Sequence, residues 1–292
     1  MRTANFKSAA IAALLSMGLL TGCTNGITNQ KTSNHMDTLN LTQEWDKKFP
    51  QSNKVNHRKV TFKNRYGITL AADLYEPKNI ESKVPAIAVS GPFGAVKEQS
   101  SGLYAQTMAE RGFLTLAFDP SYTGESGGEP RNVASPDINT EDFSAAVDFL
   151  IAHPNVDAKR IGIIGICGFG GMGLNAAAMD TRIKATVAST MYDMSRVNAN
   201  GYFDAEDSAE VRRNKREAMN AIRTRDAQNG TATPGTPGLP TSIKGDEPQF
   251  VKDYFDYYKT ERAFHARAIN SNGAWNPTMA LSFINMPLLT YI

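Results

Sequence analysis

The stretch "IGIIGICGFGGMGLNAAAMD", Ile161 to Asp180, contains a run of β-branched residues, a glycine-rich turn and a run of small and apolar residues. The first run is typical of a strand buried on both faces, and the second of a helix. A strand that leads directly into a helix is the repeating unit of a parallel sheet. The turn admits two kinds of site, because its glycines could hold a phosphate group and Cys167 could be a nucleophile.

The segments around this stretch repeat the same alternation. Two runs, 59–64 and 67–75, have the spacing of a hairpin, and four continuous apolar runs follow at 84–91, 112–120, 160–166 and 183–190. Helical patterns lie between them at 100–112 and at 139–154, the second with Asn139 and Thr140 as its expected N-terminal cap. The sequence therefore predicts an α/β fold, a doubly wound and mostly parallel sheet covered by helices on both faces.

The phosphate interpretation depends on Gly168 to Gly173, which satisfy the pattern G-x-G-x-x-G. Asp193 follows the next predicted strand, where a ribose-binding carboxylate would lie. The pattern normally opens a nucleotide-binding domain, whereas several strands precede it here. We therefore keep dinucleotide binding as the less favoured alternative.

The nucleophile interpretation depends on the small residues around Cys167. At a sharp turn from strand to helix the side chain is forced outward, and small neighbours are needed where the backbones crowd. Gly165, Gly168 and Gly170 satisfy that requirement. The N-terminus of the following helix is also expected to favour the thiolate form of Cys167.

From about residue 57 to 190 the chain resembles the α/β-hydrolase family, specifically its dienelactone-hydrolase-like branch, in which G-x-C-x-G-G carries a cysteine nucleophile. Phe169 departs from this pattern, because glycine or serine usually follows at that place. The resemblance implies that Cys167 attacks a small ester, lactone or related acyl compound, with no cofactor and no metal.

The resemblance also implies where the oxyanion donors lie. In "AVSGPFGAVKEQS" (88–100), Pro92 has no N–H, so Phe93 is the first candidate and Gly94 the next. The second donor is expected to be the backbone N–H of Gly168. In the loop 118–128, Tyr122 or Glu125 could line the pocket.

Two parts of the family's machinery are not found. A cysteine hydrolase needs a histidine base and an orienting acid after the nucleophile. Only His265 follows Cys167, in an unsuitable context, and Asp193 alone completes nothing, so the catalytic acid and base stay unknown. The resemblance also predicts two further strands. We therefore expect a C-terminally incomplete core, poorly stable and nearly inactive as this chain stands, with its base beyond residue 292.

The chain divides into four predicted regions. Residues 1–22 have the charged start and short apolar run of a lipoprotein signal peptide, with Cys23 as the lipidated residue. Residues 23–55 have the composition of a polar tether, 56–192 form the hydrolase core, and 193–292 form a helical insertion or cap rich in aromatic residues. The residue directly after Cys23 is not acidic, which favours an outer-membrane anchor facing the periplasm.

Composition narrows the partners. With 41% hydrophobic residues the chain is expected to be globular, and its 31 basic and 29 acidic residues are spread without a cluster that would bind nucleic acid. Oligomeric state leaves no mark in the sequence. Beside the hydrolase hypothesis we keep two alternatives, a non-catalytic envelope binding protein on the same scaffold and a peptidase-type hydrolase.

Overall fold

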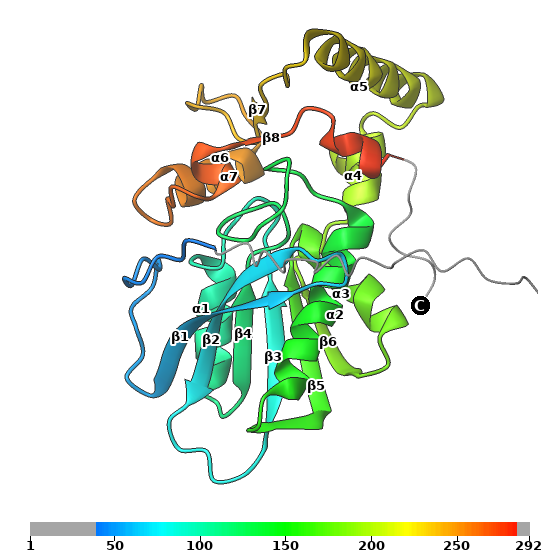
Figure 1. Cartoon of the computed structure of the whole chain (residues 1–292). Helices are drawn as coiled ribbons and strands as arrows, with labels where there is room; N and C mark the ends of the chain where they lie inside the picture. The colour runs from blue at the N-terminus through cyan, green and yellow to red at the C-terminus, as the bar shows by residue number, and fades with distance from the viewer. Residues whose placement is uncertain (1–38, 285–292) are drawn as a thin grey trace, which may run out of the picture. The chain divides into compact units, whose positions relative to one another are not determined.

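The computed structural model describes residues 39–284. Its centre is a six-stranded sheet, whose strands Figure 1 shows. The strand order is β1-β2-β4-β3-β5-β6. The first two strands and the β2–β4 pair are antiparallel, and the pairs among β4, β3, β5 and β6 are parallel. The strands are β1 (Val55–Lys63), β2 (Thr69–Pro77), β3 (Val84–Ser90), β4 (Leu114–Phe118), β5 (Val156–Ile166) and β6 (Ile183–Ser189). The predicted fold class is confirmed.

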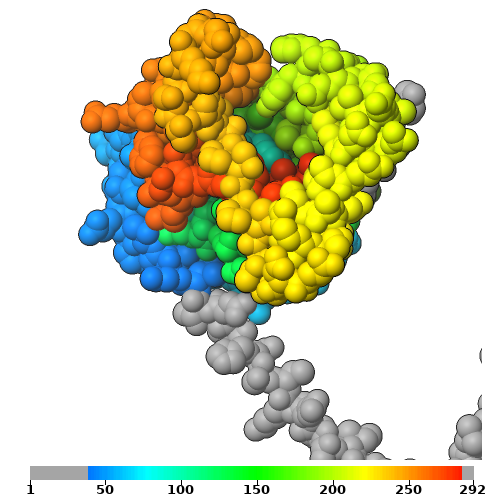
Figure 2. Space-filling view, turned by 90° about the horizontal axis from the view of Figure 1, so that it is seen from above, coloured from blue at the N-terminus to red at the C-terminus, as the bar shows by residue number. Residues whose placement is uncertain are grey.

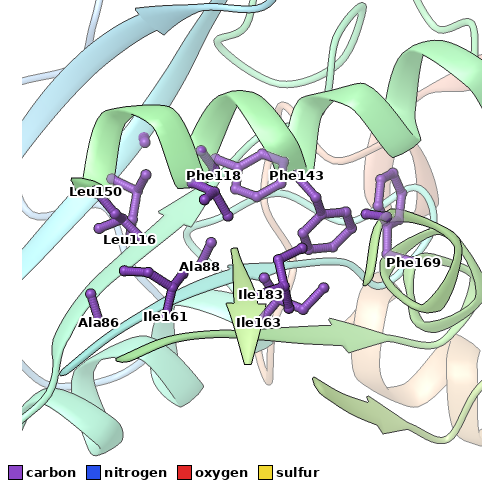
Figure 3. Packing of buried hydrophobic residues seen from close by; sticks show 14 of the residues in the cluster. Ala86, Ala88, Leu116, Phe118, Phe143, Leu150, Ile161, Ile163, Phe169 and Ile183 are labelled. Carbon is purple, nitrogen blue, oxygen red and sulfur yellow. The ribbon is translucent and has the colours of Figure 1, made fainter. Parts of the chain in front are cut away.

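Helices cover both faces of this sheet, which gives the molecule two apolar cores. On one face α1 (Ser100–Ala109) packs against β3 and β4 through Ala105 and Ala109. On the other face lie α2 (Pro136–Ala152) and α3 (Gly168–Met179). Figure 3 shows α2 passing over the sheet, where its Phe143 and Leu150 meet strand residues and Phe169.

The start of α2 differs from the prediction. Asn139 and Thr140 lie inside the helix and are buried, and the cap position belongs to Ser135, followed by Pro136 in the first turn. Proline is favoured there because a backbone N–H in the first turn has no partner within the helix, so the absence of one in proline costs nothing. Asn139 instead accepts a hydrogen bond from the backbone N–H of Ser135 at 2.9 Å.

The region after β6 consists of short helices and loops that lie beyond the carboxyl ends of the parallel strands (Figure 1). Its longest member, α5, has one buried residue, Met219, and charged sides. The elements are α4 (Met194–Asn200), the 3-10 helix η1 (Tyr202–Asp204), α5 (Ala209–Asn229), β7 (Thr236–Pro237), α6 (Gln249–Lys259), α7 (Ile269–Asn272), β8 (Ala274–Trp275) and the 3-10 helix η2 (Met279–Ser282). We call residues 193–284 the cap.

Part of the predicted polar tether is packed onto the fold. Phe49 is buried and Trp45 is partly buried in the core beneath α1. Lys47 is also buried, with its Nζ 3.0 Å from a carboxylate oxygen of Asp73. Between residues 39 and 54 the prediction of a solvated tether is therefore wrong, because two aromatic anchors outweigh the polar composition around them.

Other predictions on the N-terminal region lie outside the described residues, including the signal peptide and the lipid on Cys23. Within residues 39–284, no helix is long and apolar enough to cross a membrane.

The strand β6 forms the edge of the sheet opposite β1. Among the described strands it pairs only with β5, and its Val187 is 52% exposed.

Candidate active site

Cys167 lies at the junction between β5 and α3, where the chain turns sharply. Its backbone has φ of 56° and ψ of −127°, a conformation that non-glycine residues rarely adopt. Such strain persists only where the surroundings enforce it, and it is concentrated at functional sites. Gly165 shows the crowding: a Cβ there would lie 2.2 Å from the carbonyl oxygen of Phe169.

Phe169, the residue that departs from the pattern G-x-C-x-G-G, does not disturb this turn. Its side chain points into the core, where it is 2% exposed and lies near Phe143 and Phe93. The close approach is possible because Gly91 faces it: a Cβ on Gly91 would lie 2.9 Å from the Phe169 Cβ. Gly91 has a φ of +99°, which also favours glycine.

The two predicted oxyanion donors meet at the thiol of Cys167. Backbone N–H groups of Gly168 and Phe93 both donate hydrogen bonds to it. They come from segments far apart in sequence, the start of α3 and the loop after β3, so the sheet brings them together. Gly94, the second candidate for the first donor, lies one residue further with a φ of +80°.

The acidity of Cys167 differs from the expectation of a favoured thiolate. Burial raises the pKa of this thiol, and the hydrogen bonds from Gly168 and Phe93 lower it by less. Desolvation opposes any charged form, so a half-buried thiol without a cationic partner stays protonated. The N-terminus of α3 alone does not reverse that balance.

A cavity of about 350 Å³ opens above Cys167. In Figure 2 it corresponds to the hollow ringed by the cap segments, coloured from yellow-green to red. Its walls are mostly aromatic and apolar and carry no charged residue among those described: Pro92, Phe93, Cys167, Thr190, Tyr192, Met194, Val197, Asn198, Tyr202, Gly238, Leu239, Tyr254, Tyr258, Asn270, Trp275 and Met279.

Tyrosines dominate the polar part of this cavity. Burial raises the pKa of Tyr202, Tyr254 and Tyr258, and the nearby Cys167 adds to each shift. Tyr254 is also hydrogen-bonded to Tyr192. These hydroxyls therefore stay neutral at ordinary pH and offer hydrogen bonds rather than charge to a bound molecule.

Tyr122 and Glu125, the weak candidates for pocket residues, do not line this cavity. Tyr122 packs against Gly128 in its own loop. Glu125 belongs to a buried ionic cluster, with a carboxylate oxygen 2.6 Å from Lys59 Nζ and 2.7 Å from Lys97 Nζ. These lysines hold the pKa of Glu125 down to about 2 against the opposing effect of burial.

The ionic cluster also contains a possible cation site, because carboxylate oxygens of Glu98, Asp119 and Glu125 lie within 4.8 Å of one another. The ammonium group of Lys97 already contacts all three, at 2.7, 2.8 and 2.7 Å respectively. A lysine held by three carboxylates supplies the positive charge that a metal would supply. The cluster is therefore a structural ion network.

The described histidines do not reach Cys167. His265 is buried rather than at the surface, its ring 3.6 Å from Asp46, and burial lowers its pKa. His57 and His153 pair with carboxylates on β2. Asp193 caps α4: its carboxylate accepts hydrogen bonds from the backbone N–H groups of Ser195, at 2.9 Å, and Arg196, at 3.2 Å.

Sequence reasoning missed Tyr192 and Asn270, which line the cavity. Tyr192 stands three residues after the end of β6, and a residue near the carboxyl end of a parallel strand is a general signal for a site. Asn270 carries no such signal, because only the folded cap brings it to the loop after β3.

A protein-family model matches more than half of the chain. The family model of the X-Pro dipeptidyl-peptidase (S15 family) matches residues 66–281. Thiohydrolase aneE of Aspergillus aculeatus is 33% identical over 132 residues, covering 45% of this chain and 41% of that protein.

Two uncharacterized bacterial proteins match over more of the chain. Protein PA2218 of Pseudomonas aeruginosa is 60% identical over 297 residues, covering 100% of this chain and 79% of that protein. Its crystal structure superposes with a TM-score of 0.82 over 87% of this chain and 78% of that one. Protein YcjY of Escherichia coli is 38% identical over 218 residues, 73% of this chain and 70% of its own length.

A more distant structure shares the fold. The α/β hydrolase GrgF from Penicillium has a TM-score of 0.62 with 21% identity, over 80% of this chain and 74% of that one.

Proposed function

Because the chain belongs to the X-Pro dipeptidyl-peptidase (S15) family and has the α/β-hydrolase fold, we propose that it is a hydrolase that cleaves a small neutral ester, lactone or related acyl compound through Cys167. The observation that carries this proposal is the pair of backbone N–H groups, from Phe93 and Gly168, that converge on a thiol in the floor of an open cavity.

The proposed reaction follows from this geometry. The sulfur of Cys167 attacks the carbonyl carbon, and the electron pair of the C=O bond moves to the oxygen, where the two N–H groups stabilise it. When the carbonyl re-forms, the bond to the alcohol oxygen breaks and the alcohol leaves with the proton lost by the thiol. Water then attacks the thioester, which releases the carboxylic acid and restores the thiol.

The proton acceptor of this reaction is not among the described histidines. The raised pKa of Cys167 makes a base more important, because only the thiolate attacks efficiently. At alkaline pH the thiolate forms without a base, so nucleophilic attack can be tested on this chain directly.

The uncharged lining of the cavity favours a neutral acyl group over a peptide with a free amino terminus. A dipeptidyl-peptidase substrate carries an ammonium group, and a buried charge needs a partner of opposite sign. Among the described residues that line the cavity, none is acidic. The name of the matched family therefore does not define the substrate, and ester chemistry is better supported than peptidase chemistry.

A non-catalytic binding protein on the same scaffold is the second candidate. It is favoured by the raised pKa of Cys167 and by the distance of the described histidines from it. Under this alternative the cavity holds a neutral ligand and Cys167 transfers nothing.

Hydrolysis of p-nitrophenyl acetate across the alkaline range distinguishes the two candidates. We expect nitrophenol release to rise with pH through the pKa of Cys167 and to disappear in Cys167→Ala. Cys23→Ala, the same change at the chain's other cysteine, is the matched control and should retain the activity. Release that is equal in Cys167→Ala and in the unchanged protein would contradict the proposal.

Substrate charge is tested separately with a glycyl-prolyl-p-nitroanilide, which carries an ammonium group. We expect no Cys167-dependent cleavage of it. Faster cleavage of this amide than of the ester would instead identify a peptidase.

We also propose a lipid anchor on Cys23 and a place in the cell envelope, from the sequence pattern alone. In a bacterial host, Cys23→Ala should move the protein from the membrane fraction to the soluble fraction. An unchanged distribution would exclude lipidation at this residue.

A further inference from the structure

We propose that Asn270 is a positioning residue that holds the loop after β3 so that the N–H of Phe93 faces the thiol of Cys167. The cap would then complete the oxyanion site as well as cover it. This inference rests on the proposed acyl-transfer function and adds a residue that no sequence pattern indicated.

Two hydrogen bonds join Asn270 to that loop. Its side-chain Nδ2 donates to the carbonyl oxygen of Phe93 at 2.9 Å, and its backbone N–H donates to the carbonyl oxygen of Gly94 at 3.0 Å. The two acceptors flank the φ and ψ angles of Gly94. Glycine at a φ of +80° is the most permissive point of the loop, so the bonds fix the backbone where it would otherwise vary.

Contact between the two residues is close. A Cβ on Gly94 would lie 2.4 Å from Asn270 Oδ1, so the amide occupies the space that a side chain would take. On the other side of Phe93 lies Pro92, whose ring fixes its own φ angle. Phe93 is thus held between a rigid residue before it and a clamped residue after it.

Other cap residues hold Asn270 and Phe93 in turn. Tyr258, which is buried in α6, is hydrogen-bonded to the Asn270 side chain. Trp275 stacks on the Phe93 ring, with centroids 4.4 Å apart and planes at 29°. Both sides of the Phe93 residue, backbone and ring, therefore depend on the cap.

Acyl transfer and simple thiol modification should respond differently to loss of this clamp. Attack on an ester needs the oxyanion donors in place, and a small displacement of one is costly. Disulfide exchange between Cys167 and methyl methanethiosulfonate displaces a sulfinate and builds no oxyanion on a carbonyl. At high pH, where the thiolate is fully formed, only the first reaction should therefore need Asn270.

The test uses Asn270→Ala in the full chain, with Cys23→Ala as the background so that one thiol remains. Asn272→Ala is the matched control, because Asn272 lies in the same helix α7 and is exposed. Three quantities are measured on each protein: kcat and KM for p-nitrophenyl acetate, the rate of modification of Cys167 as a function of pH, and Tm.

We expect Asn270→Ala to lower kcat about 10- to 100-fold with little change in KM, as found when groups near a reacting centre are misplaced. At high pH the rate of Cys167 modification should stay within about twofold of the rate in the protein that keeps Asn270, because the thiolate that reacts is the same. The pH midpoint of modification should move upward, because the Phe93 N–H no longer stabilises the thiolate. Asn272→Ala should change none of these.

A parallel fall of kcat, of modification at high pH and of Tm would mean that Asn270 only maintains the structure, and would overturn the inference. If Asn270→Ala changes neither kcat nor the pH midpoint of Cys167 modification, the inference is also overturned. The proposed function itself is tested with a different variant, Cys167→Ala. Ester hydrolysis that persists in Cys167→Ala would contradict the proposed function and, with it, this inference.

Discussion

Replacing Lys97 with methionine tests the ionic cluster that supports the loop after β3. The Lys97 side chain is fully buried, and its ammonium contacts Glu98, Asp119 and Glu125 at 2.7 to 2.8 Å. Burial alone would lower the pKa of Lys97, but these carboxylates raise it well above its ordinary value. The lysine is therefore charged at neutral pH.

The expected loss follows from what each carboxylate keeps. Glu98 and Glu125 retain Lys59, at 3.2 and 2.6 Å. Among the described residues Lys97 is the one cation in ion-pair contact with Asp119, which then keeps only backbone donors. One uncompensated buried charge costs about 3–5 kcal/mol of unfolding free energy. For a domain of this size that is a decrease in Tm of roughly 6–20 °C.

The pH dependence gives the prediction a sign. Burial already raises the pKa of Asp119 despite Lys97, and removing the lysine raises it further. A folded state whose carboxyl has a raised pKa binds more protons than the unfolded state, so its stability increases as pH falls. The deficit of Lys97→Met should therefore be smaller at about pH 5 than at about pH 8.

Urea unfolding of both proteins at the two pH values measures this deficit. Arg213→Met, which breaks an exposed ion pair with Glu217, is the control and should cost less than about 1 kcal/mol. Adding Asp119→Asn to Lys97→Met should recover part of the loss. A deficit that is independent of pH, or no recovery in the double variant, would refute the reasoning.

Three further results are expected. Gly165→Ala should destabilise the protein and abolish ester hydrolysis, because its Cβ would lie 2.2 Å from a backbone oxygen, whereas Gly162→Ala on the same strand, with its nearest atom at 3.3 Å, should lose far less Tm and keep activity. The rate of Cys167 modification by iodoacetamide should have its midpoint above the ordinary thiol pKa of about 8.5, and a midpoint near neutrality would contradict the effect of burial. Trp275→Ala should raise KM for aryl esters more than for acetyl esters of alkyl alcohols, because it removes the stack on Phe93 and an aromatic wall of the cavity; equal changes in KM would argue against an aromatic contact with the substrate.

The sheet and the turn at Cys167 could be predicted because short-range patterns determine them. Continuous apolar runs, spaced glycines and the strand-to-helix junction are all visible within about twenty residues, the range over which periodicity is informative. The predicted start of α2 is wrong because Asn139 matches a cap by residue type, whereas the helix begins one turn earlier, with Ser135 at the cap position and Pro136 in the first turn.

The remaining features depend on contacts between distant segments. Asn270 meets Phe93 across 177 positions of sequence, and Arg267 meets Asp46 across 221. No local pattern marks either pair. The acidity of Cys167 was mispredicted for a similar reason, because the position at the helix start is visible in sequence and the burial that outweighs it is not.

Trapping of the acyl-enzyme tests the central claim most directly. The protein is mixed with p-nitrophenyl acetate at alkaline pH, quenched with acid and digested, and the peptide that contains Cys167 is weighed. The account predicts one acetyl group on Cys167, and none on that peptide in Cys167→Ser at the same pH and time. An unmodified Cys167 in a protein that still releases nitrophenol would contradict it.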